Sequence, residues 1–116
     1  MDHLGNAGSV AYLKEIKHPI SVARKIMEKS SHVMLVGDGA QKFALKNGFK
    51  KENILYNQSK KDWLEWKKNK NVAENLISED NHDTITLLAQ DRNGDFAAAC
   101  STSGLRYKLN GRVGDS

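Results

Sequence analysis

The chain has 116 residues, which fits one ordinary domain, and 39% hydrophobic with 28% charged residues indicate a globular rather than a disordered protein. No apolar run approaches the roughly 20 residues of a membrane-spanning helix, so we predict no membrane association. The formal net charge is +4, but its surplus lies in segment 60–70, where lysines alternate with Asp62 and Glu65. That mixed-sign pattern favours a solvated helix face over a nucleic-acid site.

The first half of the chain predicts short strands and two helices. Residues 10–13 suggest a strand or turn, and residues 33–36 a short buried strand. Pro19 fits the first position of a helix, where its missing N–H costs nothing. A turn at 37–39 should precede a helix over 40–47, which ends at Gly48. The turn lacks the rest of a phosphate-binding loop, so we interpret it as a plain turn.

The second half predicts an amphipathic helix, a linker and a hairpin. Trp63 and Trp66 lie three residues apart, on one face of the helix predicted around 60–70. A polar linker follows over 71–81. Two strands, 84–91 and 96–103, should then pair through the Asn93-Gly94 turn. Antiparallel pairing would bring Thr84 close to Thr102.

Cysteine and histidine are too sparse for a disulfide framework or a zinc site. Cys100 is the only cysteine, and its apolar neighbours predict a buried small residue rather than a nucleophile. The four histidines lack metal-ligand spacing, so we predict no metal and no other cofactor: His3, His18, His32 and His82.

The Asp83-Thr84 pair has a chemistry of its own. If this peptide bond breaks, Thr84 becomes an N-terminus whose hydroxyl lies beside its own α-amine, with an ordinary pKa of about 7.7–8.0. A threonine at an N-terminus combines a nucleophile and a base in one residue. The alternative is a polar loop end, including His82 and Asp83, ahead of a strand that favours a β-branched residue.

Three separated motifs carry a resemblance to a known family. They are HDTI at 82–85, ACSTSG at 99–104 and YKLNGRVGDS at 107–116, and segments 20–28, 32–40 and 48–53 extend the similarity upstream. In this order they resemble the glycosylasparaginases (aspartylglucosaminidases), most closely the bacterial members, which are self-cleaving N-terminal nucleophile amidohydrolases. One departure is Thr86, where the family usually has glycine, and its side chain could slow cleavage.

The resemblance implies a role for each motif residue. Thr84 would attack the Asp83 carbonyl during self-cleavage, with His82 and Asp83 positioning the bond, and afterwards attack the amide of an asparagine that carries N-acetylglucosamine. Thr102 would tune the Thr84 hydroxyl. Substrate binding would use four consecutive residues, with the first holding the α-carboxylate and the last the α-ammonium: Arg112, Val113, Gly114 and Asp115. The alternative is that Arg112 and Asp115 pair with each other at the surface.

The resemblance also implies an architecture and partners. The expected fold class is α/β, a fragment of a four-layer αββα sandwich, in which 1–83 ends the α-chain region and 84–116 begins the β-chain region. The substrate would be a small molecule, glycosylated asparagine, and the cut chains would form an α/β heterodimer that assembles in pairs. The compartment would be periplasmic in a bacterium and lysosomal in a eukaryote. A related asparaginase or isoaspartyl peptidase is the alternative activity, and an internal fragment without activity of its own is a third interpretation.

Overall fold

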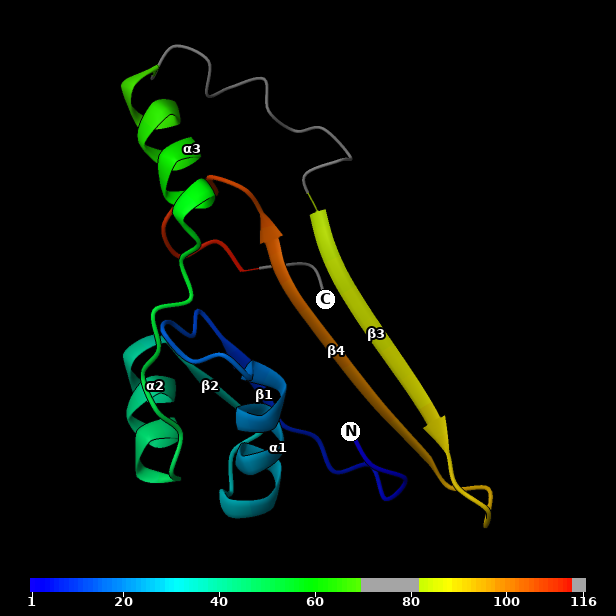
Figure 1. Ribbon diagram of the computed structural model, residues 1–116. Coiled ribbons are helices and arrows are strands. Elements are labelled where there is room, and N and C mark those ends of the chain that lie inside the picture. The colour runs from blue at the N-terminus through cyan, green and yellow to red at the C-terminus, as the bar shows by residue number, and fades with distance from the viewer. Residues whose placement is uncertain (70–81, 114–116) are drawn as a thin grey trace.

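The computed structural model describes residues 1–69 and 82–113 as a mixed α/β arrangement, which confirms the predicted class (Figure 1). Its strands form two separate two-stranded sheets, β1–β2 and β3–β4. None of its helices is long and apolar enough to cross a membrane, within the part of the chain that is described. The elements in chain order are β1 Ser9–Ala11, α1 Pro19–Lys29, β2 Met34–Val36, α2 Gly37–Lys46, α3 Asn57–Lys68, β3 His82–Gln90 and β4 Phe96–Leu105.

The core lies where α1 crosses between the parallel strands β1 and β2. Proline opens α1 as predicted, and the helix buries Val22 and Ile26 completely. These two side chains pack with Ile16 and with Ala44 of α2 in one hydrophobic cluster. A parallel pair needs a crossover connection, and α1 provides it.

Gly8 permits the close approach of the chain to α1. A Cβ at this position would lie 2.2 Å from the Ala23 carbonyl oxygen and 2.7 Å from the Met27 nitrogen. Both are backbone atoms of the helix, so they cannot move aside as a flexible side chain would. Only glycine fits at this contact.

Two predictions about the region around β2 are wrong. The expected turn at 37–39 is the first turn of α2, where Asp38 lies at the positive end of the helix dipole. The expected burial of this strand is also absent, because Met34 and Val36 are about half exposed and only Leu35 packs against the core. Successive side chains of a strand point to opposite faces, and a single face of this short strand is covered.

The predicted end of the second helix at Gly48 is confirmed. Gly48 has φ +88°, and its N–H donates to the Leu45 carbonyl while Phe49 N–H donates to Ala44. This pair of bonds is the Schellman arrangement, which satisfies carbonyls left over at a helix end.

Helix α3 contacts the segment that follows β4. The predicted amphipathic helix is present, yet none of its residues is buried. Trp66 instead stacks on Tyr107, with ring centroids 4.7 Å apart and planes 5° from parallel. The predicted linker 71–81 lies outside the described residues. The Trp66–Tyr107 stack therefore connects a helix that precedes β3 to the segment that follows β4.

Strands β3 and β4 form the long antiparallel ribbon seen in yellow and orange in Figure 1. Gly94, with φ +91°, forms the turn that the Asn-Gly pair predicted. The predicted burial of Cys100 is wrong, because its side chain is exposed. Ile85 and Leu88, on opposite faces of the ribbon, are also more than 70% exposed. The described residues thus leave both faces of this hairpin largely open.

Candidate active site

The Asp83–Thr84 peptide bond lies inside β3, at a β-bulge. The strand begins at His82, earlier than expected, because His82 pairs with Leu105. The register then changes within one peptide bond: Asp83 pairs with Gly104, whereas Thr84 pairs with Thr102. Ser103 is the extra residue on β4. Bulges change the direction of side chains and are common next to active sites. The position of this bond at a bulge is therefore consistent with a functional site.

The Thr102 hydroxyl connects the two residues of this bond. It receives a hydrogen bond from the Thr84 hydroxyl at 3.0 Å and donates one to the Asp83 carbonyl oxygen at 2.7 Å. The Gly104 N–H also donates to it, at 2.9 Å. A hydroxyl has one proton and two acceptor lone pairs, so these three bonds use its full capacity.

This arrangement suits attack by Thr84 on the preceding carbonyl. A donor aimed at a carbonyl oxygen stabilises the negative charge that develops there when a nucleophile adds. The same Thr102 oxygen accepts the hydrogen bond that the Thr84 hydroxyl donates, so one side chain contacts both the attacking group and the carbonyl. The predicted proximity of Thr84 and Thr102 is confirmed. The hydrogen bond from Thr102 to the Asp83 carbonyl was not predicted from the sequence.

Ser103 makes a second contact with Asp83 that sequence reasoning missed. Its hydroxyl donates to the Asp83 carboxylate, and its own carbonyl accepts a bond from the Lys108 ammonium. The available hint was a run of three hydroxyl residues at 101–103. Spacing alone does not say which of them faces Asp83, because the bulge decides it.

Thr86, which stands where the resemblance leads us to expect glycine, lies two residues after Thr84 on β3. Its hydroxyl donates to the Cys100 sulfur at 3.1 Å, and the two residues are paired in the register. Residues two apart on a strand share a face, so Thr86 lies on the same face as Thr84. The Thr86–Cys100 pair therefore adjoins the Thr84–Thr102 pair.

Arg112, predicted to bind substrate, lies in the segment after β4. The Nη1 atom of its guanidinium is buried and has no hydrogen-bond partner among the described residues. A buried, charged donor of this kind is costly unless an acceptor pairs with it. Val113 is half exposed, and Gly114 and Asp115 lie outside the described residues.

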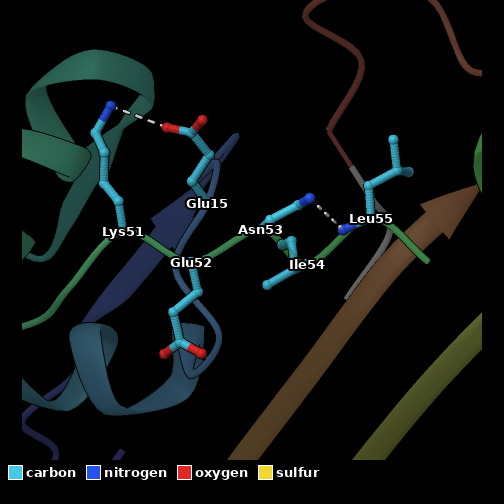
Figure 2. A pocket seen from close by; sticks show the side chains of 6 residues that line it. All are labelled: Glu15, Lys51, Glu52, Asn53, Ile54 and Leu55. Carbon is cyan, nitrogen blue, oxygen red and sulfur yellow. Dashed lines mark hydrogen bonds and ion pairs between the residues drawn. The ribbon is translucent and has the colours of Figure 1, made fainter. Parts of the chain in front are cut away.

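A surface hollow elsewhere in the structure has different chemistry. The Lys51 ammonium lies 2.9 Å from the Glu15 carboxylate, an ion pair drawn as a dashed line in Figure 2. The hydrogen bond from Lys51 holds the pKa of Glu15 below its ordinary value. None of the predicted site residues lines this hollow, whose walls come from Glu15, Lys51, Glu52, Asn53, Ile54 and Leu55. Residues 1–69 and 82–113 also contain no group of three or more His, Cys, Asp or Glu side chains able to hold a metal.

Comparison with known proteins gives consistent relatives. The family described as asparaginase matches residues 2–116. An N(4)-(beta-N-acetylglucosaminyl)-L-asparaginase of Elizabethkingia miricola is 55% identical over 116 residues, covering 100% of this chain and 34% of the relative. The rat (Rattus norvegicus) protein of the same name is 35% identical over 140 residues, covering 96% of this chain and 41% of its own. A putative N(4)-(beta-N-acetylglucosaminyl)-L-asparaginase of Drosophila erecta is 34% identical over 145 residues, covering 96% of this chain and 37% of the relative. The chain thus spans 34–41% of the length of these relatives.

Proposed function

Because this chain belongs to the asparaginase family, we propose that it carries the self-cleavage site and part of the substrate site of an N-terminal threonine amidohydrolase. The substrate we propose is asparagine bearing N-acetylglucosamine on its side-chain amide, released as aspartate. Relatives named for this activity, including one 55% identical over the whole chain, support the substrate class.

One observation carries the proposal: the Thr102 hydroxyl joins the Thr84 hydroxyl to the Asp83 carbonyl oxygen. In the first reaction, Thr84 Oγ adds to the Asp83 carbonyl carbon, and the Asp83–Thr84 C–N bond breaks. The proton that leaves the hydroxyl ends on the Thr84 nitrogen. An ester links the two residues until water hydrolyses it, which leaves the Asp83 carboxylate and a free α-amine and hydroxyl on Thr84. The Thr102 hydroxyl stabilises the charge on the carbonyl oxygen during addition.

In the second reaction, the new N-terminal Thr84 attacks the substrate amide. Its own α-amine takes the hydroxyl proton, and a β-aspartyl ester forms as the glycosylamine leaves. Water then releases aspartate and regenerates the threonine. The buried Nη1 atom of Arg112, which has no hydrogen-bond partner within residues 1–69 and 82–113, supports a role in binding the α-carboxylate, since the planar guanidinium fork matches a carboxylate. We assign the α-ammonium to Asp115, with Val113 and Gly114 between them.

The cleavage site divides the chain into two regions. Residues 1–83 end the α-chain and 84–116 begin the β-chain, with His82 and Asp83 serving the cut. In the whole protein, we propose that both belong to a four-layer αββα sandwich, in which further layers cover the hairpin. The open hairpin faces, with Ile85 and Leu88 exposed, support such a covering. Two cut protomers would assemble as a dimer of heterodimers.

Intact mass of the whole protein tests the proposal. The unaltered protein should yield a chain that starts at Thr84 and should release aspartate from glycosylated asparagine. Thr84→Ala should remain uncut, because it has no hydroxyl to attack. Thr86→Ala removes a threonine from the same face of the same strand and should still be cut. Cutting of Thr84→Ala at this bond would contradict the proposal.

A further inference from the structure

We propose that Ser103 and Lys108 are positioning residues for self-cleavage, an inference that rests on the proposed function. Among the described contacts, the Ser103 hydroxyl bonds the Asp83 carboxylate and the Lys108 ammonium bonds the Ser103 carbonyl, rather than the reacting carbonyl. They fix the bulge and the Asp83 side chain on the acyl side of the bond to be cut.

The position of Ser103 in the ladder is the first step of the argument. Asp83 pairs with Gly104 and Thr84 with Thr102, so Ser103 has no cross-strand partner in the register. Gly104, the next residue, has φ +70° and is buried. Glycine adopts this left-handed conformation without steric cost, and a bulge next to it is therefore easily accommodated.

The side chain of Ser103 uses this position to reach Asp83. Its hydroxyl donates to the Asp83 carboxylate. The adjacent Thr102 hydroxyl donates to the Asp83 carbonyl oxygen at 2.7 Å. Two consecutive residues of β4 thus hold one residue at its main chain and at its side chain. Rotation of Asp83 about its backbone or its χ1 angle would break one of these bonds.

Lys108 secures Ser103 from the other side. A residue that bulges out of a ladder leaves its backbone without the usual cross-strand partner. The Lys108 ammonium donates to the Ser103 carbonyl, which is a charge-assisted hydrogen bond. The contact also ties the segment after β4 back to the bulge. Lys108, Ser103 and Asp83 form a continuous chain of contacts that ends at the bond to be cut.

Such a chain matters because addition to a carbonyl depends steeply on geometry. A displacement of about 1 Å at the reacting atoms can cost about a hundredfold in rate. The Thr84 hydroxyl must approach the carbonyl of the residue directly before it, so the conformation of Asp83 decides the attack distance. Ser103 and Lys108 act on the rate through Asp83.

The test measures the first-order rate of self-cleavage in the whole protein by intact mass. Ser103→Ala and Lys108→Met should each be cut at least about tenfold more slowly, the scale of one lost hydrogen bond to a charged group. Ser103→Thr restores the hydroxyl and Lys108→Arg the charge, so both should return most of the rate. Matched controls are Ser101→Ala, which lies opposite Ile85, and Lys68→Met at the end of α3.

Each outcome is decisive. Slow cutting of Ser103→Ala with rescue by Ser103→Thr supports the inference, even if the alanine variant also melts at a lower temperature. Equal rates for Ser103→Ala and the unaltered protein overturn it, as does a threonine variant as slow as the alanine variant. Absence of a cut at Asp83–Thr84 in the unaltered protein would overturn the proposed function itself. If the unaltered protein is cut and Thr84→Ala is not, the proposed function stands. Equal cleavage rates for Ser103→Ala and the unaltered protein would then overturn the positioning role alone.

Discussion

The hydroxyl oxygens of Thr84 and Thr102 lie 3.0 Å apart on directly paired positions of β3 and β4. This pair is the last regular one before the bulge, because the register changes between Asp83 and Thr84. The Thr102 hydroxyl therefore reaches both its partner across the ladder and the carbonyl of the residue before that partner. The bulge gives one hydroxyl access to both reactants of the proposed cleavage.

Replacing Thr102 by valine keeps the shape of the side chain and removes the hydroxyl. We expect Thr102→Val to be cut about 100–1000-fold more slowly, the usual cost of one lost oxyanion donor. Thr102→Ser keeps the hydroxyl and should be cut much faster than the valine variant. The rate is measured by intact mass, with Thr86→Val as the matched control on the neighbouring pair. An unaltered rate for Thr102→Val would refute the role.

Arg112→Lys tests the binding of the substrate carboxylate. Lysine keeps the charge but cannot make two parallel bonds to a carboxylate. Loss of one charge-assisted bond is worth about 1.5–3 kcal/mol, so KM should rise by about 10–150-fold. Turnover is measured against substrate concentration and normalised to the amount of chain that starts at Thr84. Unchanged KM would show that Arg112 does not hold the substrate.

Gly8→Ala should destabilise the protein strongly. The new Cβ would meet the backbone of α1 at 2.2 Å and 2.7 Å, and overpacking against a backbone costs about 1–3 kcal/mol. Gly39→Ala is the matched control, because no atom lies within 4 Å of its Cβ position in the first turn of α2. Alanine is there expected to be neutral or stabilising by up to about 1 kcal/mol. Urea unfolding of both variants compares the two free energies, and equal effects would contradict the close approach.

The Trp66–Tyr107 stack should give a measurable coupling. In a double-mutant cycle with Trp66→Leu and Tyr107→Leu, we expect a coupling free energy of about 0.5–1.5 kcal/mol. Trp63→Leu is the matched control: its ring lies 5.1 Å from the Lys67 ammonium on the same helix, and it should combine additively with Tyr107→Leu. Free energies of unfolding in urea give both cycles. Additivity in the Trp66 cycle would show that the rings do not stabilise each other.

The hairpin and the first helices were predictable because their determinants are local. Asn93-Gly94 between two apolar runs predicts a hairpin turn, and the nearly equal spacing on its two sides sets Thr84 against Thr102. Pro19 and Gly48 mark helix ends through their own backbone preferences. These features depend on neighbours in the chain.

The bulge and the exposure of Cys100 were not predictable in this way. Whether Ser103 or Thr102 contacts the Asp83 side chain depends on a one-residue shift in strand register. The spacing of residues in the sequence does not reveal such a shift. An apolar neighbourhood predicts burial of Cys100 only if another layer covers the strand, and the described residues supply none. The Trp66–Tyr107 stack likewise joins segments that are remote in sequence.

Several contacts connect residues on the two sides of the proposed cut, and they would hold the two chains together until the cut protein unfolds. The Met1 nitrogen donates to the Ala98 carbonyl at 2.9 Å, and the Ala98 nitrogen donates back to Met1 at 3.0 Å. With the Trp66–Tyr107 stack, they join residues before Asp83 to residues after Thr84 without using the peptide bond. Before the cut, unfolding is unimolecular and its midpoint is independent of protein concentration. After the cut, unfolding also releases one chain from another, so by mass action the melting temperature should rise with concentration.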